Sequence, residues 1–111
     1  MQKILSCLII ILVLIGTSIY GGGDEEEQLL NTNSCVNCDL SNARLEKADL
    51  RKADFSGAKL YRANMEYADL RGANFTGADL SNVRLRGANL TNAILDNAIL
   101  RYTNLLSLIH I

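Results

Sequence analysis

The chain has 111 residues, with eleven lysines and arginines against twelve acidic residues, one histidine and no proline. This near balance of charge argues against an electrostatic nucleic-acid binder, which would carry a basic stripe, and the chain is not strongly acidic either. One histidine and the absence of a glycine-rich phosphate loop leave no visible catalytic constellation. We therefore expect a protein that is not an enzyme and that holds no cofactor or metal.

The first twenty residues are predicted to direct export. Lys3 precedes an apolar run over residues 8–15, and small residues occupy positions 16–18. A positive start, a short apolar region and a small-residue end are the pattern of a secretory signal peptide, which we assign to residues 1–20. Residues 4–20 are at the lower length limit for a membrane span, so a retained membrane anchor is the alternative. Without the signal the chain has ten basic and twelve acidic residues, and we expect it to bind neither membrane nor nucleic acid.

Residues 21–34 are predicted to form a glycine joint followed by a short capping helix. The glycines at 21–23 give a flexible joint, and Asp24 can cap a helix that runs to about Leu30. Glu27 would be the capping-box partner of Asp24, and the acidic residues suit the positive end of the helix dipole. The helix would cover the bottom of the segment that follows; the alternative is a solvated acidic tail.

Cys35 and Cys38 open the next segment with C-x-x-C spacing. In an exported protein the leading interpretation is a disulfide across the first turn. Two alternatives stay open: a pair of small buried thiols, and a thiol–disulfide redox pair, which would need an exposed thiolate. A zinc site would need two further ligands, and His110 lies at the other end of the chain.

Residues 35–107 carry a period of five. From Cys38 to Ser107 the sequence divides into fourteen units without an insertion. In each unit the first residue is usually Ala, the second is usually Asp or Asn, and the third is large and apolar. The third-place residues, the predicted core stack, are Leu40, Leu45, Leu50, Phe55, Leu60, Met65, Leu70, Phe75, Leu80, Leu85, Leu90, Leu95, Leu100 and Leu105.

A period of five excludes an ordinary helix and a flat strand. On an α-helix, five residues advance about 140° beyond a full turn, so the leucines would scatter around the cylinder. On a flat strand an odd spacing throws successive residues onto opposite faces. The pattern is satisfied if the chain turns a corner at every unit, so that each third-place residue points inward again.

A second period of twenty residues gives the number of sides. Phe55 and Phe75 lie twenty residues apart in matching contexts, and twenty residues are four units. A four-sided coil would therefore stack one phenylalanine on the other. Fourteen units over four sides predict about 3.5 coils, just above the three repeats that a solenoid needs.

The repeated motif A-(D/N)-L-x-x resembles that of the pentapeptide-repeat family over about two thirds of the chain. The resemblance implies an all-β fold, a right-handed quadrilateral β-helix. It also implies that the first and third places face the interior and that the other three places face solvent. Small exported members with a C-x-x-C-D-L start are similar to those of cyanobacteria, where they reside in the periplasm or the thylakoid lumen. The resemblance names no partner.

The outward charges are interpreted as solvated faces, because single surface charges usually have no other role. Residues 49–51 would stack under residues 69–71, which sets rows of like charge beside rows of opposite charge. The adjacent side would hold a modest basic patch: Arg44, Arg84 and Arg86, with Glu46, Glu66, Tyr61 and Tyr67 nearby.

The end of the repeat is more apolar, and residues 108–111 form a C-terminal tail or cap. An exposed apolar cluster of this kind indicates a cap over the top coil or an interface between two copies. Family members often pair through their C-terminal ends, so a homodimer is a hypothesis. The cluster consists of Ile94, Ile99, Leu106, Leu108 and Ile109.

The function we expect is that of an exported structural or protein-binding module with an unidentified protein partner. The first alternative is a DNA mimic that regulates a DNA-binding enzyme such as gyrase. Family members with that role are cytoplasmic, longer and strongly acidic. The second alternative is a thiol–disulfide redox protein that uses Cys35 and Cys38. Fold alone does not decide between these functions.

Overall fold

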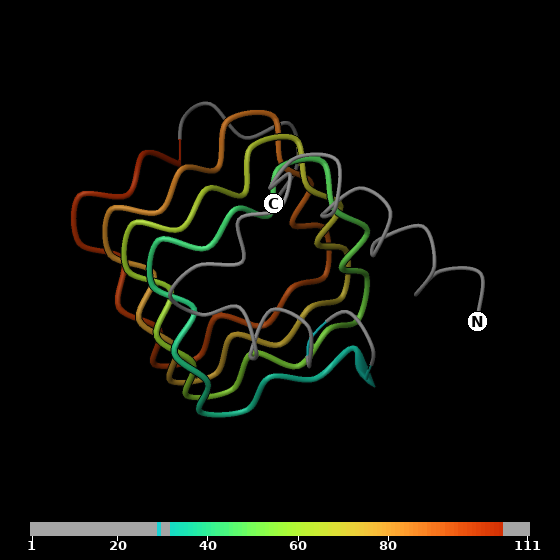
Figure 1. The fold of residues 1–111 in the computed structure, drawn as a ribbon, viewed down its shortest axis with the longest axis vertical. Coiled ribbons are helices and arrows are strands. Elements are labelled where there is room, and N and C mark those ends of the chain that lie inside the picture. Colours follow the sequence, from blue (N-terminus) through green and yellow to red (C-terminus); the bar gives the residue numbers. More distant parts are fainter. Residues whose placement is uncertain (1–28, 30–31, 106–111) are drawn as a thin grey trace.

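The computed structural model describes Leu29 and residues 32–105, and in it the chain winds into a four-sided coil (Figure 1). Successive coils lie against one another in chain order, from the teal to the red part of the ribbon. The predicted signal or anchor over residues 1–20 and the glycine joint lie outside the described residues. Within the described residues, no helix is long and apolar enough to span a membrane.

The bottom of the coil is covered by Leu29. Its side chain is fully buried in the core, as expected for a residue that covers the first coil. Leu29 and Thr32 have helical backbone, and the N–H of Asn33 donates to the carbonyl of Leu29 at 2.7 Å. The rest of the predicted capping helix lies outside the described residues and stays a prediction.

Each coil takes twenty residues and pairs with the next through parallel β-bridges. The ten bridges of the described residues join second-place residues twenty positions apart, from Ser34 with Asp54 to Asp79 with Ile99. Each bridge is isolated, so each side contributes one paired residue rather than a longer strand. The predicted four sides are confirmed. The number of coils stays a prediction, because the last unit extends beyond the described residues.

Three backbone hydrogen bonds accompany each of these ten bridges between one coil and the next. On the first side, the N–H of Lys59 donates to the carbonyl of Cys38 at 2.8 Å. The N–H of Leu40 then donates to Lys59 at 2.7 Å, and that of Asn42 donates to Tyr61 at 2.9 Å. The second, third and fifth places thus bond between coils. This pairing satisfies backbone groups that would be costly to bury alone.

The corners depend on a left-handed backbone at the fifth place of each unit. A hydrogen bond from the first-place N–H to the preceding third-place carbonyl closes the corner, as from Ala43 to Leu40 at 3.0 Å. A positive φ at the third position of such a turn is the requirement of a type II β-turn. Positive φ is found at all fourteen fifth places from 37 to 102. They are Asn37, Asn42, Lys47, Lys52, Gly57, Arg62, Tyr67, Gly72, Gly77, Asn82, Gly87, Asn92, Asn97 and Tyr102.

The core contains the first- and third-place side chains, as predicted. The rings of Phe55 and Phe75 stack with centroids 4.9 Å apart and an interplanar angle of 3°, which confirms the predicted pair. The third-place residues from Leu40 to Leu90 are at most 3% exposed. The last three members of the predicted stack are only half-buried, because they lie in the last described coil: Leu95, Leu100 and Leu105.

One outward position departs from the expected pattern. Ser81, a fourth-place residue, is only 7% exposed, although the fourth place was expected to face solvent. Its column on the same side contains Tyr61 below it and Arg101 above it. We attribute the burial to this difference in size, because a short side chain between two long ones is covered by them.

A pair of glycine substitutions tests the corner geometry. Gly77 and Gly87 have φ values of +68° and +70°, so an alanine at either position would lose about 1–2 kcal/mol of stability to the left-handed conformation. A Cβ at Gly77 would meet nothing within 4 Å, whereas a Cβ at Gly87 would overlap the ring of Tyr67. We expect Gly87→Ala to cost about 1 kcal/mol more than Gly77→Ala in urea unfolding. Equal losses from the two substitutions would show that Tyr67 does not pack on this corner.

Candidate functional site

The interior of the coil is filled with side chains, so the groups available for function lie on its outer faces. Two faces carry most of the polar contacts. We call residues 48–52, 68–72 and 88–92 the ion-pair face. We call residues 43–47, 63–67, 83–87 and 103–105 the arginine face.

Second-place Asp and Asn side chains hold the turns that shape these faces. The Oδ1 atom of Asp39 accepts a hydrogen bond from the backbone N–H of Ser41 at 3.1 Å. Asn64 and Glu66 form the same contact on the arginine face, also at 3.1 Å. This bond from a side chain to the backbone two residues on is the Asx turn. It explains the preference for Asp or Asn at the second place, which the sequence analysis noted without a reason.

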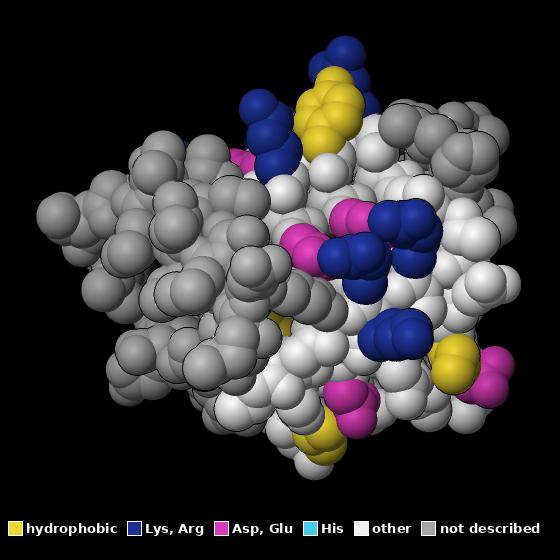
Figure 2. Space-filling model, turned by 90° about the vertical axis from the view of Figure 1, so that its right-hand side faces the viewer, with side chains coloured by type: hydrophobic (Ala, Val, Ile, Leu, Met, Phe, Trp, Pro, Cys, Tyr) yellow, Lys and Arg dark blue, Asp and Glu magenta, His cyan; other side chains and the backbone are white. Residues whose placement is uncertain are grey.

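The ion-pair face neutralises its own arginines. Arg51 donates to both carboxylate oxygens of Asp49 at 2.8 Å, and Arg71 donates to both oxygens of Asp69 at 2.8 and 2.6 Å. Arg51 also lies 3.8 Å from Asp69 in the next coil. The predicted rows of opposite charge are therefore confirmed. Figure 2 shows one face of the molecule on which acidic and basic side chains lie next to one another.

These contacts shift the pKa values of three aspartates. The hydrogen bond from Arg71 lowers the pKa of Asp69 and raises the pKa of Arg71 itself. Hydrogen bonds from Ser41 and Ser81 lower the pKa values of Asp39 and Asp79 in the same way. In each case the bond is made to the charged form of the carboxyl, which it favours.

The arginine face is arranged differently. Glu66 pairs with Arg84 in the next coil, at 3.0 Å between Oε2 and Nη2. Below them, Asn64 donates to Oε1 of Glu46 at 2.8 Å. The other carboxylate oxygen of Glu46 is buried and has no hydrogen-bond partner in the described part of the chain. On this face, therefore, one carboxylate meets a guanidinium group and another meets an amide group of the next coil.

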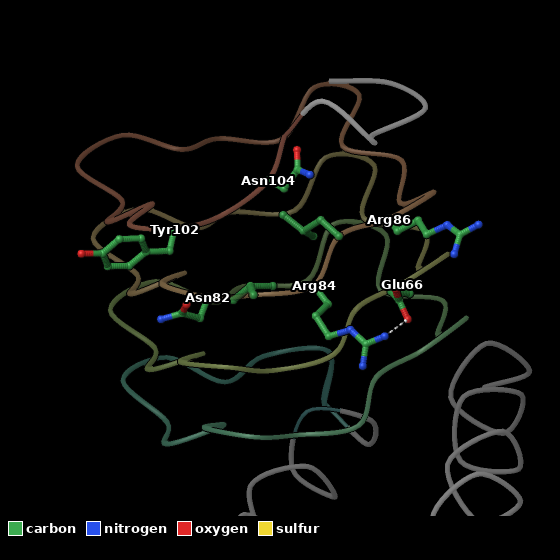
Figure 3. A pocket seen from close by; sticks show the side chains of 8 residues that line it. Glu66, Asn82, Arg84, Arg86, Tyr102 and Asn104 are labelled. Atoms are coloured by element: carbon green, nitrogen blue, oxygen red, sulfur yellow. Dashed lines mark hydrogen bonds and ion pairs between the residues drawn. The ribbon is translucent and has the colours of Figure 1, made fainter.

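An open pocket of about 360 Å³ lies on the upper part of the arginine face. Figure 3 shows that Arg84 points toward Glu66, whereas Arg86 extends away from that pair. The pocket brings together two arginines of the predicted basic patch, Arg84 and Arg86, with one of its acids. Arg44, Tyr61 and Tyr67 are not among its lining residues. The lining residues are Glu66, Asn82, Val83, Arg84, Leu85, Arg86, Tyr102 and Asn104.

Three polar pocket residues were missed by the sequence analysis: Asn82, Tyr102 and Asn104. The signal for Asn104 was present, because it lies twenty residues after Arg84 and so belongs to the same column of second places. Asn82 and Tyr102 are also twenty residues apart and stand in one corner column. Applying the twenty-residue period to the outward places would have found both columns.

Cys35 and Cys38 form a disulfide at the bottom of the coil, with their Cα atoms 5.2 Å apart. They are 0% and 7% exposed. Cys35 is the third-place residue below Phe55, so the bridge lies under the phenylalanine stack. Its sulfurs are thus shielded from the exchange partners that a redox pair has to meet.

The C-terminal cluster is only partly within the described residues. Ile94 and Ile99 are 44% and 45% exposed. Leu106, Leu108 and Ile109 lie outside the described residues, as does His110. Among the described residues, no group of three potential ligands could hold a metal ion.

A profile of a known protein family matches the repeat. The profile described as "Pentapeptide repeats" matches in eight copies over residues 38–77 and 78–107. Together with the twenty-residue coil, this match gives the fold as a right-handed β-helix solenoid. A search of the curated proteins gave no match to the sequence.

Several solved structures are similar to this chain. HetL, a pentapeptide-repeat protein of the cyanobacterium Nostoc involved in heterocyst differentiation regulation, is 41% identical over 60% of this chain and 35% of its own, with a TM-score of 0.42. A pentapeptide-repeat protein of the cyanobacterium Cyanothece is 32% identical over 62% of this chain and 47% of its own, with a TM-score of 0.36. A pentapeptide-repeat protein from the Arabidopsis thaliana thylakoid lumen is 29% identical over 86% of this chain and 73% of its own, with a TM-score of 0.40. This chain spans about a third of HetL and about half of the Cyanothece protein.

Two substitutions of Asp69 separate its turn from its ion pairs. Asp69→Asn keeps the turn, because asparagine accepts the same bond at positions 64, 74 and 89, but loses both ion pairs. At pH 7 we expect a loss of less than about 1 kcal/mol, since the arginines are half-exposed. Asp69→Ala also removes the hydrogen bond of the turn. We expect it to lower the free energy of unfolding in urea by about 1 kcal/mol more than Asp69→Asn does. Equal losses would mean that the Asx bond contributes nothing.

The same variants have a predicted pH dependence. The pKa of Asp69 in the folded state is lowered from 3.8. The stability that its ionised carboxylate contributes is therefore present above that pH and is lost as the pH falls through the lower folded-state pKa. The stability difference between the wild type and Asp69→Asn should therefore shrink in urea titrations below about pH 4. A difference that stays constant down to about pH 2 would contradict the assigned ion pair.

Proposed function

The chain belongs to the pentapeptide-repeat family, and on that premise we propose that it is an exported, non-enzymatic module that presents rigid, flat faces to a partner protein. Proteins of this family are generally structural or binding proteins without enzymatic activity. The observation that carries the proposal is the filled interior. The third-place side chains from Leu40 to Leu90 leave no internal space for a substrate, so recognition falls to the outer faces.

Export is supported by the sequence and by the cysteines. Residues 1–20 have the pattern of a signal peptide, with an anchor over residues 4–20 as the alternative. A disulfide between Cys35 and Cys38 is suited to the periplasm or the thylakoid lumen, because reducing compartments keep thiols free. We therefore place the protein in one of these compartments.

The two alternative functions have less support. A DNA mimic needs a strongly acidic surface, whereas the formal net charge of this chain is −1 and its arginine face carries Arg84 and Arg86. A thiol–disulfide redox protein needs an accessible sulfur, whereas Cys35 and Cys38 are nearly fully buried.

The C-terminal end is a second surface of the proposed module. Ile94 and Ile99 expose nearly half of their side chains next to the half-buried residues of the last described coil. Exposed apolar side chains on the last described coil favour an interface. We include in the proposal a homodimer that forms through this end.

Site-specific photo-crosslinking in the producing cell tests the proposal. A photoreactive phenylalanine analogue replaces Tyr61 in one variant and Ile99 in another; the native side chains are 42% and 45% exposed. We expect a discrete adduct with one other protein from position 61, and an adduct of twice the chain mass from position 99. The adducts are weighed after the compartments are separated, with and without reductant.

Three outcomes of this experiment are decisive. A mass that lacks about the first twenty residues, found outside the cytoplasm with two hydrogens missing before reduction, supports the export and the disulfide. A full-length cytoplasmic chain with free thiols contradicts both. The binding role fails if neither position gives a specific adduct.

A further inference from the structure

We propose that the pocket on the arginine face binds a carboxylate from an acidic segment of a partner protein. The inference rests on the proposed function, because it names the face and the partner chemistry of the same binding module. It begins from a difference between the two polar faces. The arginines of the ion-pair face bind aspartates, whereas Arg86 on the arginine face has no partner among the described residues.

The lining of the pocket combines apolar side chains with polar and charged ones. Val83 and Leu85 are each 3% exposed and form part of its lining. Asn82 and Asn104 also line it, and the amide group of Asn82 can donate hydrogen bonds. Tyr102 is 88% exposed and lies at the side opposite Arg86 in Figure 3. Tyrosine and arginine side chains are both enriched in protein interfaces.

The charge of the pocket matches a single negative group. Arg84 and Arg86 contribute two positive charges and Glu66 contributes one negative charge, so the pocket carries a net charge of +1. One carboxylate would neutralise it. A phosphate with a charge near −2 would overcompensate and would be repelled by Glu66, which stays in place as the partner of Arg84. The charges therefore favour a carboxylate over inorganic phosphate or a phosphate monoester.

Arg86 is the residue that binds the partner's carboxylate in this proposal. Within the described residues, no hydrogen bond or ion pair to its side chain is found. On the ion-pair face, in contrast, Arg51 and Arg71 each bind an aspartate through two nitrogens. A partner's carboxylate can form with Arg86 the same two-nitrogen contact, which is the favoured geometry between guanidinium and carboxylate.

The column that contains Arg86 shows why this arginine has no partner among the described residues. The fourth places of the arginine face are Glu46, Glu66 and Arg86 in successive coils. The charge therefore changes sign at the third coil. Glu66 already pairs with Arg84, whose side chain remains 63% exposed. The pair holds Arg84 beside the pocket with some of its donors still accessible. Less side-chain conformational entropy is therefore lost when a partner binds.

NMR of the arginine side chains tests the pocket. The ¹⁵N-labelled full chain is titrated with tetraglutamate blocked at both ends, and the Nε–Hε signals are followed. We expect saturable shifts of the Arg84 and Arg86 signals and small shifts for Arg51 and Arg71. Tetraglutamine and inorganic phosphate are the matched probes. No saturable shift with tetraglutamate, or a stronger response to phosphate, overturns the proposal.

Two variants with the same change of charge provide the control. Arg86→Gln should weaken the binding of tetraglutamate at least about tenfold, since hydrogen bonds to charged groups are the stronger ones. Arg71→Gln removes one arginine from the ion-pair face and should leave the affinity within about twofold, because exposed charges farther away are screened by salt. Equal weakening by both would mean that overall charge, not this pocket, attracts the peptide. The same spectra report whether each variant is folded.

Two results distinguish a failure of the pocket proposal from a failure of the proposed binding function. A partner that crosslinks from position 61 equally well in the wild type and in Arg86→Gln would leave the binding module standing and overturn the pocket. Saturable binding of tetraglutamate by a chain that forms no adduct in the cell would support the pocket and contradict the cellular role.

Discussion

The left-handed backbone at the fifth place is the constraint on which the rest of this structure depends. It lets the chain turn a corner within five residues, so that the third-place side chain of each unit points inward again. Gly and Asn adopt this conformation readily, but Lys47, Arg62 and Tyr67 adopt it at a cost of about 1–2 kcal/mol each. The hydrogen bonds within each corner and between coils must offset that cost. The coil is therefore stable only as a stack, as expected for a solenoid.

The same constraint arranges the outer faces. Since a coil takes twenty residues, residues twenty apart form columns, and a substitution in one coil changes one position of one column. On the ion-pair face Asp and Arg repeat in step, so each of its two arginines is paired with an aspartate. The arginine face changes from Glu66 to Arg86 and is left with a positive charge. A rigid scaffold holds these groups without help from a loop, which limits the entropy lost when a partner binds.

The period of five allowed the coil, the phenylalanine stack and the ion-pair rows to be predicted, because each follows from register alone. The left-handed fifth place was not predicted, since lysine, arginine and tyrosine occupy it beside glycine and asparagine. The pocket was missed for another reason. The sequence placed Arg84 and Arg86 on one side, but it does not show that Arg84 points toward Glu66 in the neighbouring coil while Arg86 extends away (Figure 3). Likewise, the burial of Ser81 depends on the size of its column neighbours.

Amide hydrogen exchange of the folded chain tests the account most directly. The N–H groups of Leu60 and Arg62 donate to the next coil at 2.8 and 3.0 Å, so they should exchange slowly. The N–H of Tyr61 has no backbone acceptor among the described residues, and the second-place residue before it is Lys59, which cannot form an Asx turn. It should exchange quickly, and fast fourth-place exchange should recur wherever the second place lacks Asp or Asn. Slow exchange at residues 60 and 62 with fast exchange at 61 is the predicted result. Equal rates at these three positions would contradict a coil held by this ladder.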